Sequence, residues 1–139
     1  MAKVTMQADF KVAPQKVWDL IGGFNALPDW HPAVEKSVLE KEGMVRRLSL
    51  AGGGTVVEKL ERVDDNERVY SYSIIDSPLP VADYIATIRV KDDGQGNSIV
   101  EWSSEFVPKG APEGNAIEAI QGIYQAGFDN LKKMLEAWK

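Results

Sequence analysis

The segment Asn115–Trp138 reads NAIEAIQGIYQAGFDNLKKMLEAW, and its pattern predicts one long amphipathic helix. The apolar positions that recur at helical spacing are Ile117, Ile120, Ile123, Tyr124, Phe128, Leu131, Met134, Leu135 and Trp138. Asn115 is the predicted N-cap residue, and Glu118 follows it at the spacing of a capping box. At 1.5 Å per residue such a helix is about 35 Å long. It is therefore long enough to cross a whole sheet.

Strand-like segments fill the chain before this helix. Val4–Phe10 alternates apolar and polar residues with the period of a half-buried strand. Six further strands are predicted between turn signals, at roughly 33–41, 44–50, 55–63, 68–75, 83–91 and 98–107. Pro14 begins a short helix that ends at Gly22, and Phe24–Pro32 has room only for a turn or a short helical piece. We therefore expect an α+β fold with a seven-stranded antiparallel sheet, two short helices and a long C-terminal helix that together form a shell around a cavity.

The composition limits the classes of function. With 139 residues and 44% hydrophobic content, residues 1–139 are expected to form a single domain large enough to build a core or to enclose a cavity. The net charge of -5 argues against a nucleic-acid partner. With one histidine and no cysteine, only carboxylates remain as metal ligands, so we predict no metal. No cofactor is expected either. Met1–Phe10 has no apolar core, which predicts neither a signal peptide nor a membrane span and favours a cytoplasmic location.

Strand alternation predicts which side chains share the inner face of the sheet, because every second residue points the same way. In the last three strands the large residues fall on one face, which we expect to lie against the long helix. They are Tyr70, Tyr72 and Ile74, then Tyr84, Ala86, Ile88 and Val90, then Val100, Trp102, Ser104 and Phe106.

The hairpin around Gly52, Gly53 and Gly54 carries a charge on each inner face. Its two predicted sets are Met44, Arg46, Leu48 and Leu50, and Val56, Glu58 and Leu60. Pairing Leu50 with Val56 would place Glu58 beside Leu48 and diagonal to Arg46. Burying either charge alone is costly, so we expect Arg46 and Glu58 to be paired. The pair is either an internal salt bridge or a place where the polar end of a ligand binds, directly or through water.

Three other features allow two interpretations each. Gly127 lies within the apolar stripe of the long helix, where the missing side chain either leaves room for a ligand or lets the helix approach the sheet. His31, the single histidine, is either a general base or a packing and hydrogen-bonding residue at the rim of the cavity. The triple glycine is either a flexible flap over the cavity or a plain hairpin turn.

The chain resembles the polyketide cyclase/dehydrase-like family of the START-like superfamily, also called SRPBCC or helix-grip proteins. The resemblance covers nearly the whole chain and rests on the order of elements and on six short segments: Trp30-His31-Pro32, Val45-Arg46-Arg47-Leu48, Gly53-Gly54-Thr55-Val56-Val57-Glu58, Tyr70-Ser71-Tyr72, Pro78-Leu79-Pro80 and Val100-Glu101-Trp102. It implies a curved antiparallel sheet that grips the C-terminal helix around a cavity for apolar small molecules.

The stretch from Glu58 to Tyr84 is also distantly similar to the plant abscisic-acid receptors, in which the counterparts of Glu58, Tyr72 and Tyr84 face the hormone. Two loops depart from that pattern. The receptor gate is replaced by Ala51-Gly52-Gly53-Gly54 and the latch by Leu79-Pro80-Val81, while Pro32 falls near the position of the lysine that meets the hormone carboxylate. Hormone reception of that type is therefore not expected.

The preferred function is binding of a hydrophobic or amphipathic small molecule such as a lipid, an isoprenoid or an aromatic polyketide-like compound. The predicted ligand-binding residues are Trp30, His31, Arg46, Leu48, Glu58, Tyr72, Ile74, Tyr84, Trp102, Ser104, Ile120, Tyr124 and Gly127. The alternative is an enzyme for cyclisation, dehydration or hydrolysis, with Glu58 or His31 as base and Tyr72 or Tyr84 as hydrogen-bond donor. A third hypothesis is an accessory protein that binds partners through exposed apolar residues at Pro78–Val81. The protein is expected to be a monomer or a homodimer.

Overall fold

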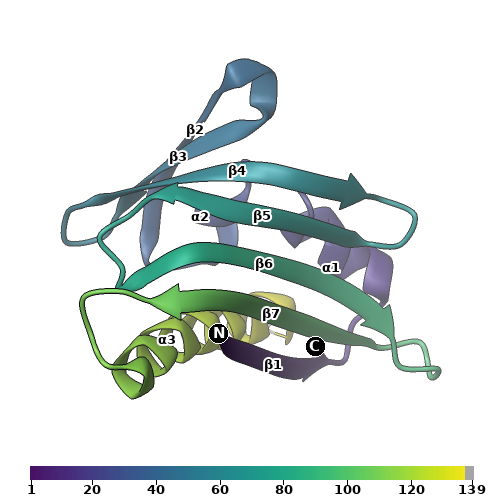
Figure 1. Cartoon of the computed structure of the whole chain (residues 1–139). Coiled ribbons are helices and arrows are strands. Elements are labelled where there is room, and N and C mark those ends of the chain that lie inside the picture. The colour runs from purple at the N-terminus through teal and green to yellow at the C-terminus, as the bar shows by residue number, and fades with distance from the viewer. Residues whose placement is uncertain (137–139) are drawn as a thin grey trace.

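A seven-stranded antiparallel sheet curves around the long C-terminal helix in the computed structural model, which describes residues 1–136 (Figure 1). The strands are β1 (Ala2–Phe10), β2 (Val34–Glu40), β3 (Val45–Leu50), β4 (Thr55–Asp64), β5 (Val69–Asp76), β6 (Val81–Asp92) and β7 (Ser98–Pro108). The helices are α1 (Pro14–Ile21), α2 (Leu27–Trp30) and α3 (Glu113–Glu136), and a single 3-10 turn, η1 (Lys41–Gly43), connects β2 to β3.

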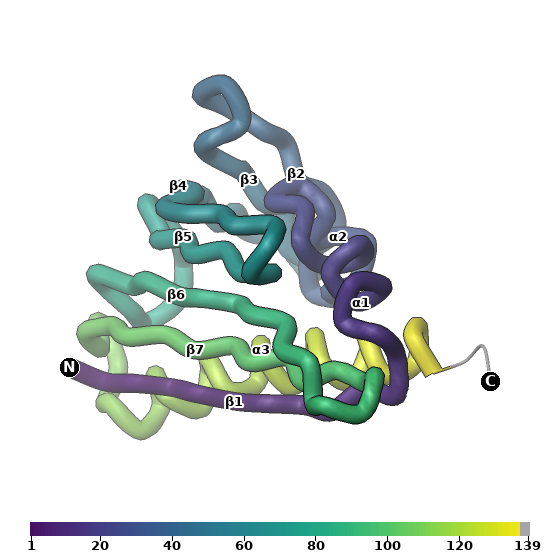
Figure 2. The backbone as a smooth tube through the Cα atoms, turned by 90° about the vertical axis from the view of Figure 1, so that its right-hand side faces the viewer, coloured from purple at the N-terminus to yellow at the C-terminus, as the bar shows by residue number. Residues whose placement is uncertain are grey.

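The sheet is a meander closed by its first strand. Strands β2 to β7 neighbour one another in chain order, and β1 pairs with β7, so the order is β1-β7-β6-β5-β4-β3-β2. Figure 2 shows the curvature of the sheet, with α3 running along β1 and β7 and with α1 and α2 on the same side. The predicted fold class and order of elements are confirmed.

The inner face follows the predicted alternation. Ten of the side chains assigned to it are at most 5% exposed, and the eleventh, Ile74, is half-buried. Their outward neighbours Ile85 and Glu105 are exposed. The ten are Tyr70, Tyr72, Tyr84, Ala86, Ile88, Val90, Val100, Trp102, Ser104 and Phe106.

Helix α3 begins two residues earlier than the capping pattern predicted. It starts at Glu113, and the backbone N–H of Ala116 donates to the carbonyl of Pro112, 3.1 Å away. Asn115 therefore lies in the first turn and the predicted cap is wrong, because the carbonyl of Pro112 already accepts the first hydrogen bond of the helix. Trp138, the last apolar position of the predicted helix, lies outside the described residues.

The register of β3 and β4 differs by two residues from the predicted pairing. Leu48, not Leu50, lies opposite Val56, so Arg46 lies directly opposite Glu58. Leu50 instead belongs to the turn, where its N–H donates to the carbonyl of Gly54 and its carbonyl accepts from Gly53. Met44, also predicted to face inward, precedes the strand and is 47% exposed.

A bulge in β6 orients one tyrosine of the inner face. The pairing with β7 shifts between Ala82 and Ile85, and Asp83 adopts a positive φ of 52°. Such a left-handed residue is strained for any side chain with a Cβ, and bulges are used to re-aim neighbouring side chains. Here the bulge precedes Tyr84, which is 4% exposed on the inner face.

Among the described helices, none combines the length and the apolar character that a membrane crossing requires.

Candidate functional site

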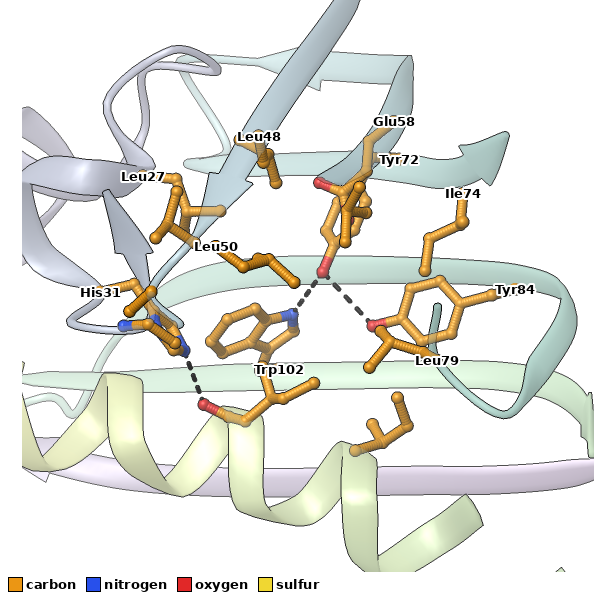
Figure 3. A pocket seen from close by; sticks show the side chains of 16 residues that line it. Leu27, His31, Leu48, Leu50, Glu58, Tyr72, Ile74, Leu79, Tyr84 and Trp102 are labelled. Carbon is orange, nitrogen blue, oxygen red and sulfur yellow. Dashed lines mark hydrogen bonds between the residues drawn. The ribbon is translucent and has the colours of Figure 1, made fainter. Parts of the chain in front are cut away.

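A cavity of about 200 Å³ lies between the inner face of the sheet and α3 (Figure 3). Its walls come from strands β2 to β7, from the segment around α2 and from one side of α3. Most of the lining is apolar. The lining residues are Leu27, His31, Ala33, Val34, Leu48, Leu50, Ala51, Val56, Glu58, Tyr72, Ile74, Leu79, Tyr84, Trp102, Ile120 and Ile123.

The loops between β3 and β4 and between β5 and β6 surround the mouth of this cavity. Ala51 is exposed, and Leu50, Leu79 and Ile123 are half-buried, whereas the deeper lining is buried. The two loops approach each other, since a Cβ built on Gly54 would lie 3.8 Å from Cγ of Pro78. Leu79 lines the cavity and Val81 is buried, so the segment predicted to expose apolar residues turns its large side chains inward.

Arg46 on β3 and Glu58 on β4 form a buried ion pair at the wall of the cavity. Nε and Nη2 of Arg46 both contact Oε1 of Glu58, at 2.8 and 2.7 Å, and Nη1 donates to the carbonyl of Phe24 at 2.6 Å. The guanidinium also lies over the Phe24 ring, 4.3 Å from its centroid, which adds a cation–π contact. Glu58 lines the cavity, but Arg46 does not. Burial raises the pKa of Glu58, and the Arg46 charge and hydrogen bonds oppose that rise.

Three phenols and one indole form a hydrogen-bonded chain across the cavity. Nε1 of Trp102 donates to Oη of Tyr72 at 3.1 Å, Tyr72 and Tyr84 are joined at 3.3 Å, and Tyr84 and Tyr124 at 2.5 Å. Figure 3 shows the Tyr72 oxygen between the Trp102 indole and the Tyr84 phenol. Burial raises the pKa of Tyr72 and of Tyr84 well above the usual value, so both phenols stay protonated at neutral pH.

His31 is buried with both ring nitrogens engaged. Nε2 lies 2.7 Å from the carbonyl of Ile123, and Nδ1 accepts from the N–H of Ala33 at 3.1 Å. Because a carbonyl only accepts and an amide N–H only donates, these partners select the neutral tautomer with the proton on Nε2. Burial lowers the pKa of His31, and the bond to Ile123 opposes that change. The ring therefore ties α2 to α3 and has no nitrogen free to accept a proton from a substrate.

Gly127 is the point of closest approach between α3 and the aromatic core. A Cβ at this position would lie 2.9 Å from both His31 and Trp30 and 3.1 Å from Trp102. The space left by the missing side chain is thus filled by three rings. Of the two interpretations of Gly127, the structure shows close approach.

Eight of the thirteen predicted ligand-binding residues line the cavity: His31, Leu48, Glu58, Tyr72, Ile74, Tyr84, Trp102 and Ile120. The other five, which are Trp30, Arg46, Ser104, Tyr124 and Gly127, lie behind the lining in contact with it or in the core.

Eight lining residues were not on the predicted list. Three of them, Leu50, Val56 and Ile123, already carried the apolar-face signal of their strand or helix. Leu27, Ala33 and Val34 flank the two prolines around α2, where no periodicity exists, and Ala51 and Leu79 belong to loops. Within residues 1–136 no group of three or more His, Cys, Asp or Glu side chains is placed to hold a metal ion.

Comparison with known proteins places this architecture in a family. The sequence model of one family, described as polyketide cyclase/dehydrase and lipid transport, matches residues 1–136. The chain belongs to this family. None of the curated proteins matches the chain.

Several solved structures share the fold. The protein XoxI from Bacillus cereus is 43% identical, with a TM-score of 0.95 over 97% of this chain and 96% of that chain. The Zhui aromatase/cyclase from Streptomyces sp. R1128 is 17% identical, with a TM-score of 0.78 over 97% and 93%. A START superfamily protein from Mycobacterium smegmatis is 11% identical, with a TM-score of 0.81 over 99% of both chains. The last two likenesses show the helix-grip fold alone.

Membership of the polyketide cyclase/dehydrase and lipid transport family, together with the START-like fold, is consistent with binding of hydrophobic ligands and with cyclase or dehydrase chemistry.

Proposed function

We propose that the protein binds a small, mostly apolar molecule in the cavity between the sheet and α3, with residues 1–136 acting as one ligand-binding domain. The observation that carries the proposal is the cavity itself, an apolar space of about 200 Å³ with a few polar groups on its walls. A buried space lined in this way is the usual form of a small-molecule site. Protein interiors are closely packed, and empty apolar volume lowers stability, so a void of this size favours a ligand-binding role.

The volume of the cavity limits the size of the ligand, and so narrows the ligand classes predicted from the sequence. Pockets for drug-sized ligands measure about 300–1,000 Å³, and an apolar cavity of about 150 Å³ accepts benzene. At about 200 Å³ this cavity matches a single ring with a short substituent. A monocyclic aromatic or isoprenoid compound therefore fits better than a multi-ring polyketide or a lipid, whose remainder would extend through the mouth beside Ala51 and Leu79.

Enzymatic activity is the second candidate, and one observation favours it. Glu58 is a carboxylate on the wall of an apolar cavity, and burial raises its pKa toward the range of a general base. The direct ion pair with Arg46 works against proton transfer, and His31 has no free nitrogen. The geometry therefore supports binding more strongly than catalysis.

The binding proposal is tested with toluene as an apolar probe and with a matched pair of variants on β5. Ile74 lines the cavity, whereas its neighbour Ile75 is 57% exposed on the opposite face. Titration followed by two-dimensional NMR should shift the signals of Tyr72, Trp102 and Ile120. Ile74→Trp should abolish these shifts by filling the cavity, and Ile75→Trp should preserve them.

Native mass spectrometry of protein isolated without organic solvent complements the titration, since a retained ligand would add its mass. The proposal fails when toluene leaves the cavity signals unchanged, or when Ile74→Trp binds toluene as well as the wild type does.

A further inference from the structure

One carboxylate oxygen on the cavity wall has no donor. Oε1 of Glu58 receives both contacts from Arg46. Within the described part of the chain, no hydrogen bond reaches Oε2 of Glu58. Oε2 is not among the fully enclosed atoms without a partner, so its hydrogen bond can come from water or from an occupant of the cavity. Because Glu58 lines the cavity, an occupant with an N–H or O–H group is placed to supply that bond.

The positive charge that pairs with Glu58, the guanidinium of Arg46, does not line the cavity. Arg46 is 1% exposed, and Nη1 is held by the Phe24 carbonyl while the other two nitrogens contact Glu58. No Lys or Arg side chain of residues 1–136 is part of the cavity lining. The His31 ring, which is neutral, has both nitrogens engaged. A ligand anion would therefore meet a carboxylate with no accessible cation beside it.

The phenol chain adds a donor of its own. Tyr72, Tyr84 and Tyr124 carry three O–H hydrogens between them, and the two bonds that join the phenols use two of these. Trp102 fills one acceptor position on Tyr72 by donating to it. One phenol hydrogen remains. When Tyr124 donates to Tyr84, this hydrogen is on Tyr72 or Tyr84, which line the cavity, so the cavity wall can both accept a hydrogen bond and donate one.

We infer that the cavity selects neutral, ring-sized ligands that carry a hydroxyl group and rejects carboxylates; this specificity rests on the proposed binding function. An alcohol or phenol donates to Oε2 of Glu58 and can accept from the tyrosine chain. A ketone of the same size leaves Oε2 unsatisfied. Arg46 already neutralises Glu58, so a charged ligand of either sign brings an unpaired charge into apolar surroundings.

The test compares four six-membered rings that differ in one substituent: cyclohexanol, cyclohexanone, methylcyclohexane and cyclohexanecarboxylate. Dissociation constants are measured by NMR titration of the wild-type protein at pH 7. A hydrogen bond to a charged acceptor predicts that cyclohexanol binds at least about tenfold more tightly than cyclohexanone. Cyclohexanecarboxylate should show no saturable binding.

The outcomes separate the specificity from the binding function. Equal affinity for cyclohexanol and cyclohexanone, or saturable binding of the carboxylate, overturns the specificity while the binding function stands. When none of the four rings, methylcyclohexane included, shifts the cavity signals, the binding function and the specificity both fail.

Glu58→Gln then assigns the preference to one side chain. The glutamine carbonyl can keep the bond from Arg46, and the NH2 group then replaces the free acceptor by a donor. The preference for cyclohexanol should be lost, because the hydroxyl and the ketone oxygen can both accept from the NH2 group. Glu61→Gln is the matched control on the same strand, because Glu61 is exposed and accepts from Ser73 outside the cavity. A folded Glu58→Gln variant that keeps the wild-type preference contradicts the assignment, and the wild-type series decides the specificity without any variant.

Discussion

His31 makes the stability of the protein depend on pH in a window where few other groups titrate. Burial lowers the pKa of His31, so the unfolded state binds a proton at pH values at which the native state does not. The stabilisation is complete above the ordinary pKa of about 6.5 and is lost as the pH falls toward the lowered native value. It is the single histidine of the chain, and carboxylates ordinarily titrate below this window. The exception in direction is Glu58, whose pKa is raised by burial and whose contribution to stability has the opposite dependence on pH.

We therefore predict that the free energy of unfolding falls between pH 7.5 and pH 5.5, by up to about 1.4 kcal/mol per pH unit. Urea denaturation at several pH values measures it. In His31→Gln, which keeps a donor for the Ile123 carbonyl but does not titrate, the slope should largely disappear. An unchanged slope in that variant would assign the pH dependence to other groups.

Gly127 is predicted to resist substitution even though alanine is the better helix former. Gly127→Ala gains about 1 kcal/mol of helix propensity but drives a methyl group against the rings of Trp30, His31 and Trp102. Overpacking of a dense core costs about 1–3 kcal/mol, so a net loss of roughly 1 kcal/mol is expected. Gly122→Ala on the same helix has no atom within 4 Å of the new Cβ and should be stabilising. Equal effects of the two substitutions in chemical denaturation would contradict the close packing.

At the scale of the element, the start of α3 can be tested through Asn115. As an N-cap residue it would lose about 1 kcal/mol on replacement by alanine. In the structure it lies exposed in the first turn, where alanine is the better helix former by about 0.5 kcal/mol. Asn115→Ala should therefore leave the free energy of unfolding unchanged or raise it slightly. A loss near 1 kcal/mol in urea denaturation would show that the helix begins at Asn115 after all.

Strand faces and strand registers differ in how far a sequence predicts them. The inward direction of Tyr72, Tyr84 and Trp102 follows from a period of two that needs no knowledge of the neighbouring strand. The register of β3 against β4 depends on how many residues the turn uses. Gly52, Gly53 and Gly54 all adopt positive φ, and the turn lies one residue earlier in the chain than the predicted pairing requires, which brings Arg46 opposite Glu58.

At the scale of the whole molecule, the sequence predicted the shell better than the space inside it. Apolar periodicity gives the order of strands and helices, because each element must bury one face. The cavity depends on which large rings fill the interior. Tyr124 fits the apolar pattern of its helix as Trp102 fits that of its strand, yet of these two only Trp102 reaches the lining. That difference arises from packing in three dimensions and leaves no periodic signal along the chain.

Ligand binding should stabilise the whole fold by mass action, since the unfolded chain has no cavity. At a concentration of ten times Kd, cyclohexanol should add about 1.4 kcal/mol, which for a chain of 139 residues raises Tm by roughly 5 °C. Differential scanning calorimetry measures the shift. Ile74→Trp should show none, and an equal shift in that variant would indicate that cyclohexanol acts elsewhere on the protein.

The pairing of β1 with β7 bears on how the chain acquires its shape. Ala2 lies opposite Phe106, and Gln7 bonds Glu101 across 94 residues of sequence. The entropy of closing so long a loop rises with its length, and contacts this distant in sequence slow folding. Strand β1 is synthesised before the other strands of this sheet, and it can pair only after β7 has been made. Its apolar residues Val4 and Met6 stay unprotected until then, which makes the opening strand the segment most exposed to misassociation during synthesis.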